Sequence, residues 1–358
     1  MTSSKLFEPL QINGVQFTNR AWVSPMCQYS AKDGFVSEWH RVHLGSFATG
    51  GTGLIMVEAS GVTPEGRITP DCPGLWSDEH VEKFRPIVDF AHSMGTRIGI
   101  QLAHAGRKAS TFAPWKGNGS VPITDGGWET VAPSAIPFGD YATPRAISTD
   151  EIAAQVEAFV LAAKRVVAVG FDVVEIHAAH GYFLHQFLSP LTNLREDEYG
   201  GDFVGRTRFL REVAAAVRAA IPATTPLFVR ISATDWVDGG WDLEQSIELA
   251  KELKKLGVDF IDVSTGGLVH DAKIPAGPNF QVPFAAAIRK EAEIATSAVG
   301  FITEPAQAEA IIAEGSADAV MLARAFLRNP RWALNAAETL GVTIPWPKQF
   351  ERARTLPA

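Results

Sequence analysis

The chain has 358 residues, of which 46% are hydrophobic and 20% are charged, and its formal net charge is −8. This composition is typical of a globular protein with one large or two medium α/β domains. The negative charge argues against a binding surface for nucleic acid or anionic lipid, which requires an excess of Lys and Arg. Two cysteines, Cys27 and Cys72, are too few for a disulfide framework or for a cysteine-rich zinc or iron–sulfur site.

The first residues, "MTSSKLFEPL", lack the basic and apolar regions of a signal peptide, and no apolar run is long enough to span a membrane. We therefore expect a cytoplasmic protein. The next segment, "FEPLQINGVQFTNR", predicts a β-hairpin that turns at Asn13 and Gly14. We expect this hairpin to close one end of the domain.

Beyond the hairpin, one pattern recurs: an amphipathic helix, a glycine, and a short apolar run that ends in a polar residue. In the helix predicted over residues 151–169, Ser148 and Glu151 form a capping box, and Gly170 follows the last turn. Comparable helices are predicted over residues 243–256 and from Pro305 to near Gly315. The apolar runs predict eight strands, at residues 21–26, 53–58, 97–102, 172–177, 227–231, 259–264, 296–300 and 318–322.

Strands that alternate with helices pair in parallel through right-handed crossovers. Eight such units predict a single-domain (β/α)₈ TIM barrel. The alternative is a doubly wound sheet, but its G-x-G-x-x-G turn is missing after every strand. A barrel also explains the polar strand ends, because TIM-barrel active sites lie at the carboxyl ends of the strands. The long segment 103–147 follows the third strand at that face, and we expect it to act as a lid or binding loop.

The stretch "VEIHAAHGYFLHQFLSP" (residues 174–190) brings His177, His180 and Tyr182 to the end of the fourth strand. A lone histidine is most often structural, whereas two histidines and a tyrosine at a strand end favour a functional cluster. We expect His185 to lie in the following helix as a structural residue. Glu175 points into the barrel by strand alternation, and the sequence assigns it no role.

The polar residues at the other strand ends distinguish a metal site from an organic cofactor site. These residues are Cys27, Glu58, Gln101, Arg230, Ser264 and Arg324. Two arginines would repel a cation, which disfavours a metal. Arg230 instead suits a ring that becomes negative on reduction, and Gln101 can both donate and accept hydrogen bonds at a pyrimidine-like edge. Arg324 follows the last strand, where TIM barrels bind phosphate.

The chain resembles the old yellow enzyme family of FMN-dependent ene-reductases over essentially its full length. Within that family it is similar to the thermophilic-like subclass, which includes bacterial NADPH dehydrogenases and xenobiotic reductases. The resemblance lies in "NRAWVSPMCQYSAKDG", "VEASGVTPEGRI", "QLAHAGRKA", "IHAAHGYFLHQFLSPLTNLREDEYGG", "FVRIS", "VGFI" and "PKQFERA".

The resemblance implies a tightly but non-covalently bound FMN, with one group of residues at the isoalloxazine ring and another at the phosphate. The ring group is Ser24, Pro25, Met26, Cys27, Ala59, Gln101 and Arg230, with Arg230 on the N1 and C2=O side. The phosphate group is Gly300, Ala323 and Arg324. Cys27 would also tune the flavin potential and touch the substrate. Ala323 stands where the family usually has Gly, and a backbone contact to phosphate tolerates the methyl group.

On the substrate side, the resemblance implies that His177 and His180 bind a carbonyl or nitro oxygen, Tyr29 lies over the substrate, and Tyr182 donates a proton. Arg352, in the tail 341–358, would reach the neighbouring active site of a homodimer or homotetramer, and Arg328 would assist at the same interface. Phe350 stands where related tails often carry Tyr, so a hydroxyl contact is lost.

We therefore expect a ping-pong oxidoreductase. NADPH or NADH reduces FMN and leaves, and flavin N5 then delivers hydride to the β-carbon of an activated alkene while Tyr182 protonates the α-carbon. Suitable acceptors are α,β-unsaturated carbonyls, maleimides and nitro compounds. The alternatives are a flavin-binding sensor without turnover and a metal-dependent barrel hydrolase. A dienoyl-CoA reductase relative would need an iron–sulfur cluster, which two cysteines exclude.

Overall fold

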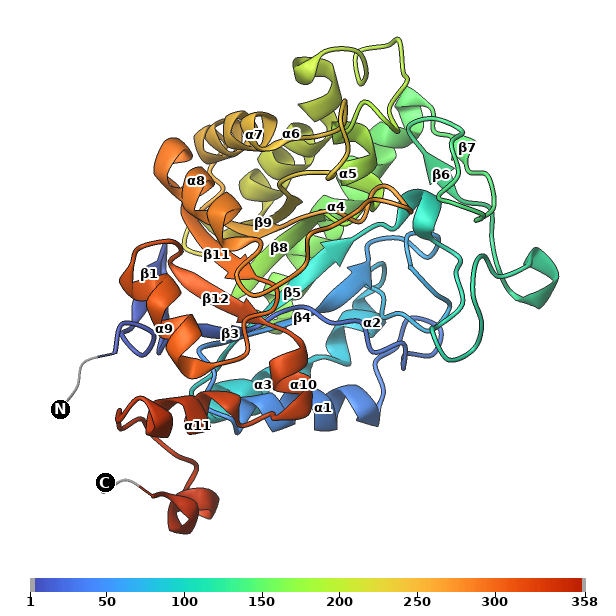
Figure 1. Ribbon diagram of the computed structural model, residues 1–358. Coiled ribbons are helices and arrows are strands. Elements are labelled where there is room, and N and C mark those ends of the chain that lie inside the picture. The colour runs from blue at the N-terminus through green and yellow to red at the C-terminus, as the bar shows by residue number, and fades with distance from the viewer. Residues whose placement is uncertain (1–3, 356–358) are drawn as a thin grey trace.

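The structure, a computed structural model, describes residues 4–355. Eight parallel strands form a closed barrel in chain order, with the last strand paired to the first (Figure 1). They are β3 (Ala21–Val23), β4 (Leu54–Gly61), β5 (Arg97–Ala103), β8 (Val173–Ala178), β9 (Leu227–Ser232), β10 (Phe260–Ser264), β11 (Ala295–Val299) and β12 (Ala319–Leu322). The predicted TIM barrel is confirmed. The strand predicted over residues 21–26 ends earlier, at Val23, because Pro25 has no N–H to donate to a ladder.

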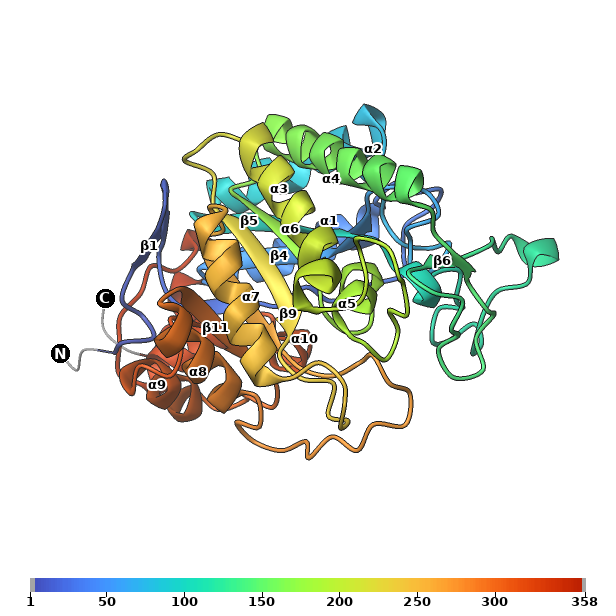
Figure 2. The ribbon, with the colours of Figure 1, turned by 90° about the horizontal axis from the view of Figure 1, so that it is seen from above.

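Helices surround the barrel in both views (Figures 1 and 2). The longer ones are α1 (Glu38–Ala48), α3 (Arg85–Ser93), α4 (Thr149–Val169), α6 (Phe203–Ala220), α7 (Leu243–Lys255), α8 (Val282–Ala292), α9 (Pro305–Ala313) and α11 (Trp332–Thr339). Short ones are α2 (Asp78–Glu82), α5 (Phe183–Leu188), α10 (Arg324–Arg328) and the 3₁₀ turns η1 (Gly106–Lys108), η2 (Ile123–Asp125) and η3 (Lys348–Ala353). The capping box at α4 is present, and Gly170 ends this helix with a φ of +106°. No helix in the described part of the chain is long and apolar enough to cross a membrane.

The N-terminal hairpin closes the floor of the barrel. Its strands β1 (Leu10–Ile12) and β2 (Val15–Phe17) pair antiparallel around the predicted turn. Ile12 and Phe17 pack among the apolar side chains that fill the lower barrel, and the Phe17 ring lies 4.7 Å from that of Trp22. Polar groups that face the interior can therefore gather only above this layer.

The excursion 103–147 contains η1, η2 and the paired β6 (Val131–Ala132) and β7 (Arg145–Ala146). In both views it projects from the barrel on the side away from β1 (Figures 1 and 2). Arg107 ties it to the barrel: its guanidinium donates to the carbonyls of Ile136 and Pro137 at 3.2 and 3.1 Å and to that of Leu268 at 2.7 Å. The excursion is thus fixed to the loop that follows β10.

Candidate active site

A polar layer lies inside the barrel above the apolar floor. Side chains alternate along each strand, so Phe228 and Arg230 on β9 face inward, as do Phe260 and Asp262 on β10. The aromatic pair stacks at 4.5 Å and belongs to the floor, and the charged pair stands one step higher. The Arg230 Nε atom lies 2.9 Å from Asp262 Oδ2.

Arg230 is held by groups from three other strands or strand ends. Its Nη2 donates to the Oγ of Ser24, just after β3, at 3.2 Å. Ser297 on β11 donates its hydroxyl to Asp262 Oδ1 at 2.6 Å, which fixes the carboxylate that pairs with Arg230. The cation predicted to stabilise a reduced ring is therefore rigid and desolvated, and such preorganised charge acts strongly on a neighbouring ligand.

Gln101 and Glu175 form the other half of this layer. Gln101 Nε2 donates to Glu175 Oε1 at 2.8 Å across paired positions of β5 and β8. Glu175 is fully buried, and burial raises its pKa to about 8, with a further upward contribution from Asp262. The interior position of Glu175 is as predicted.

His177, His180 and Tyr182 meet at the carboxyl end of β8. The rings of His177 and His180 lie 5.3 Å apart, and those of His177 and Tyr182 lie 5.1 Å apart. His180 Nε2 is 2.7 Å from the Oγ of Ser264, which fixes the ring. Burial lowers the pKa values of both histidines well below the usual range, with Arg230 adding to the effect, so both imidazoles are neutral at neutral pH.

The backbone of this turn is unusual. His180 has a φ of +57°, and its N–H donates to the Oγ of Ser232 at 2.9 Å. Gly181, with a φ of +70°, approaches the loop after β10 so closely that a Cβ would stand 2.3 Å from the carbonyl oxygen of Gly267. Contacts with neighbouring residues hold this strained turn in its conformation, which is common at functional sites.

His185 has the structural position predicted for it. It is fully buried in α5, its Nδ1 accepts the Gly181 N–H at 2.9 Å, and its Nε2 lies 2.9 Å from Asp235 Oδ1. The ring therefore supports the turn that carries His180 and Tyr182.

Cys27, Tyr29 and Tyr182 lie in one cluster at the mouth of the barrel. Burial raises the pKa values of the Tyr182 phenol, the Tyr29 phenol and the Cys27 thiol above their usual ranges. All three groups therefore keep their protons at neutral pH. Tyr182 is available as a hydrogen-bond or proton donor, and Cys27 is a neutral thiol.

A cavity of about 560 Å³ opens beside Tyr182. The excursion supplies most of its wall. Its lining includes Tyr29, Lys108, Phe112, Phe138, Tyr141 and Tyr182.

Lys108 is a site residue that sequence reasoning missed. Its Nζ donates to the carbonyls of His180 and Gly267 at 2.8 and 2.9 Å and lies 4.9 Å from the centroid of the Tyr182 ring. Burial lowers its pKa to about 7. The available signal was its place in "QLAHAGRKA", directly after a strand end.

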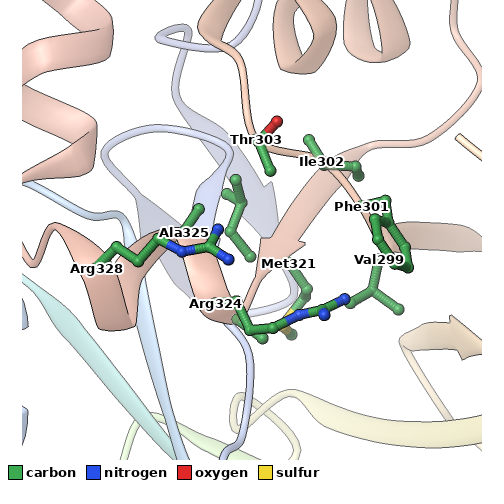
Figure 3. A pocket seen from close by; sticks show the side chains of 11 residues that line it. Val299, Phe301, Ile302, Thr303, Met321, Arg324, Ala325 and Arg328 are labelled. Atoms are coloured by element: carbon green, nitrogen blue, oxygen red, sulfur yellow. The ribbon is translucent and has the colours of Figure 1, made fainter. Parts of the chain in front are cut away.

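A second cavity, of about 100 Å³, lies between the ends of β11 and β12 (Figure 3). Gly300, Ala323, Arg324 and Arg328 line it, and Figure 3 shows the side chains of both arginines at its edge. Neither arginine has an ion-pair or hydrogen-bond partner within residues 4–355, although the Arg324 guanidinium lies 4.5 Å from the Phe301 ring centroid. Two uncompensated cations beside a small cavity suit a phosphate dianion.

Gly300 is required by its conformation. Its φ is +100°, and a Cβ there would stand 2.4 Å from Gln281 Nε2. Ala323 is the N-cap residue of α10 and lines the same cavity. Ala59 is buried at the barrel mouth in the cluster of Cys27, and Pro25 and Met26 lie in the segment between Ser24 and Cys27.

Arg352 stands apart from these groups. It is exposed on η3, beyond α11. The site residues predicted within one chain thus converge at the carboxyl end of the barrel, and Arg352 does not join them in its own chain.

Comparison with known proteins identifies the family. The model of the NADH:flavin oxidoreductase / NADH oxidase family matches residues 5–342. The chain belongs to this family. The predicted resemblance to the old yellow enzymes is confirmed, and with it an FMN cofactor and a nicotinamide nucleotide as reductant.

Relatives within the family are similar over nearly the whole chain. The NADPH dehydrogenases of Geobacillus sp. (strain WCH70) and Bacillus subtilis (strain 168) are 48% and 47% identical, and each alignment covers 97% of this chain and 98% of the relative. The structure of morphinone reductase superposes with a TM-score of 0.79 at 27% identity, over 97% of this chain and 92% of that one.

A larger reductase shares the same fold. The 2-naphthoyl-CoA reductase structure superposes with a TM-score of 0.85 at 25% identity, over 94% of this chain. The chain spans 52% of the length of that reductase.

The residues of this chain fit FMN. Gln101 is held through its Nε2 by Glu175 at 2.8 Å, and its carbonyl oxygen has no hydrogen-bond partner among the described residues, as expected of a group that faces a ligand. Arg324 and Arg328 present free charge at the other end of the site, beside the close backbone of Gly300. Gln101, Arg230, Arg324 and Gly300 are therefore the residues that would hold the cofactor.

Proposed function

We propose that this protein is an NADPH-dependent ene-reductase that acts on alkenes conjugated to a carbonyl or nitro group. The observation that carries the proposal is the convergence of His177, His180 and Tyr182, with rings 5.3 and 5.1 Å apart, at the carboxyl end of β8. Two neutral imidazoles and a protonated phenol form a set of hydrogen-bond donors without a charged base. This set suits the reduction of a polarised double bond.

Bound FMN supplies hydride, and the chain's own residues supply the rest of the chemistry. As hydride reaches the β-carbon, the carbon–carbon π electrons shift toward the carbonyl or nitro oxygen, which becomes negative. N–H donors on His177 and His180 stabilise that oxygen. Tyr182 then gives its phenolic proton to the α-carbon, and solvent restores the proton. The alkene gains one hydride and one proton in total.

The reductant and the order of events follow from the relatives and from the shape of the site. The relatives named NADPH dehydrogenases favour NADPH. The cavity beside Tyr182 has the proposed proton donor in its wall, so nucleotide and alkene would occupy it in turn. This arrangement supports a ping-pong cycle.

The excursion would act as the lid of that cavity. Phe112, Phe138 and Tyr141 come from it and line the space beside Tyr182, whereas Arg107 anchors its base to the barrel. Side chains on this anchored excursion would cover a substrate bound beside Tyr182.

We further propose a homodimer or homotetramer in which Arg352 enters the neighbouring site. The side chain is exposed, and the tail that carries it leaves the barrel beyond α11. Arg328 lines the phosphate cavity of its own chain, and its assistance at the subunit contact is proposed only where that phosphate is held by Arg324.

Isotope labelling tests the proposed reaction. With NADPH deuterated at the transferred position, 2-cyclohexenone should gain deuterium at its β-carbon only. With unlabelled NADPH in D₂O, deuterium should enter at the α-carbon. NADPH oxidation without any saturated product would contradict the proposal and favour an oxidase or a flavin-binding sensor.

A further inference from the structure

Glu175 is a fully buried acid to which the proposed reaction gives no task. Its Oε1 accepts from Gln101 Nε2 at 2.8 Å, and its Oε2 is buried without a hydrogen-bond partner among the described residues. An ionised carboxylate in this position would leave one oxygen uncompensated in a low-dielectric interior, at a large cost in free energy.

The charged groups that face Glu175 do not compensate it. Arg230 on β9 is the nearby cation, but it is already paired with Asp262 on β10 at 2.9 Å. Asp262 is also fixed by the Ser297 hydroxyl on β11 at 2.6 Å, so it does not release the cation. His177, two residues along β8, is neutral because burial lowers its pKa. Asp262 and Arg230 therefore form a neutral pair, and a charge on Glu175 would be unbalanced.

We propose that Glu175 is a positioning residue for the flavin: as a neutral carboxylic acid it orients the Gln101 amide, and its ionisation makes the flavin harder to reduce. Glu175 and Gln101 occupy paired positions on adjacent strands. Their hydrogen bond holds the Gln101 NH₂ group and so fixes the direction of the Gln101 carbonyl oxygen. The Gln101 carbonyl oxygen has no hydrogen-bond partner among the described residues and remains available to the cofactor.

Ionisation of Glu175 affects reduction of the flavin through its charge. Reduction adds electrons to the flavin, and a new negative charge in the layer that carries Arg230 opposes it. The neutral acid does not. Burial, with a further contribution from Asp262, raises the pKa of Glu175 to about 8, so the effect should begin near that pH.

The test is a redox titration of the FMN-loaded enzyme against pH, without an alkene. Above pH of about 8 the oxidised form has lost the Glu175 proton and reduction draws it back. The reduction equilibrium should therefore weaken by an additional factor of about 10 per pH unit between that point and the higher pKa that Glu175 has in the reduced form. Glu175→Gln keeps an oxygen that accepts from Gln101 but cannot ionise. The plot of the reduction equilibrium against pH should therefore have a break near this pH in the wild type and no such break in Glu175→Gln.

Glu58→Gln is the matched control. Glu58 is also a buried strand glutamate, but it is partnered by His40 Nε2 at 3.2 Å and by the Gln28 N–H at 2.9 Å. Its substitution should leave the break in place. A break that survives in Glu175→Gln would overturn the electrostatic part.

Two further measurements complete the test. Infrared spectra of the wild type at pH 7 should contain the carbonyl band of a protonated carboxylic acid, which shifts in D₂O and is lost in Glu175→Gln. Absence of this band from the wild type would contradict the neutral state of Glu175.

Glu175→Ala removes the hydrogen-bond acceptor of Gln101, so FMN should bind to this variant roughly fivefold more weakly than to Glu175→Gln. Equal FMN affinities of these two variants would show that Glu175 does not position Gln101. Neither measurement depends on alkene reduction, so the result stands apart from the proposed activity.

Discussion

The ammonium nitrogen of Lys108 lies 4.9 Å from the centroid of the Tyr182 ring. A cation in this position stabilises the negative charge that the phenol acquires when it releases its proton. Lys108→Met should therefore slow alkene-driven reoxidation of the flavin by roughly 10-fold or more, a modest share of a general-acid contribution. Reduction by NADPH should change little. Stopped-flow measurement of the two half-reactions separates the effects, and equal slowing of both would contradict this role.

The same contact predicts a pH dependence. Burial lowers the pKa of Lys108 to about 7, so the cation is present below that pH and is lost as the pH rises through it. The rate of the alkene half-reaction in the wild type should fall above about pH 7. The fall should be absent in Lys108→Met and displaced to higher pH in Lys108→Arg. If the rate of the alkene half-reaction falls above about pH 7 in Lys108→Met as it does in the wild type, another group causes the pH dependence.

Tyr182→Phe should separate acceptors that need a proton on carbon from those that do not. The phenol keeps its proton at neutral pH because burial raises its pKa, and its removal should slow enone reduction roughly 100-fold or more. A quinone acceptor is protonated on oxygen, which exchanges with solvent, and its reduction should be nearly unaffected. Equal losses with enone and quinone would indicate a structural role for Tyr182.

Arg324→Ala should weaken FMN binding. Its guanidinium lines the cavity at the ends of β11 and β12 without an ionic partner among the described residues (Figure 3). Loss of a charge-assisted contact to phosphate should raise the Kd roughly 10- to 100-fold. Arg331→Ala is a suitable control, because Arg331 lies against the Phe350 ring at 4.4 Å and does not line this cavity. FMN fluorescence on dilution gives the Kd of FMN for each variant. Equal Kd values for Arg324→Ala and Arg331→Ala would show that the phosphate binds elsewhere.

Arg352→Ala tests the subunit contact. If the side chain completes a neighbouring site, the variant should raise the KM for the alkene several-fold while FMN stays bound. The wild type should lose the same affinity when it is diluted to monomers, as followed by analytical ultracentrifugation. Loss of FMN from Arg352→Ala as readily as from Arg230→Ala would show that Arg352 has a different role.

The barrel could be predicted because each unit carries local information. The helix pattern, the glycine at φ +106° after α4, and the apolar runs are all readable from neighbouring residues, and the resulting strand limits fall within a few residues of those observed. The first strand shows the limit of such reasoning. The predicted strand extends past Val23 to residue 26, but Pro25 ends the ladder.

The site could be predicted only in part. His177, His180 and Tyr182 are close in the chain, so one turn brings them together. Lys108 is far from them in sequence, and its contact with Tyr182 depends on how η1 folds over the end of the barrel. Similarly, strand alternation places Glu175 in the interior, but its unbalanced charge becomes evident only when Arg230 is seen to be paired with Asp262.

The most direct test of alkene reduction is the visible spectrum of the purified protein, followed anaerobically through NADPH and then 2-cyclohexenone. The flavin band should bleach with one equivalent of NADPH and return with one equivalent of the enone, with cyclohexanone as the product. A band that bleaches with NADPH and stays bleached in the presence of the enone would contradict the proposed activity.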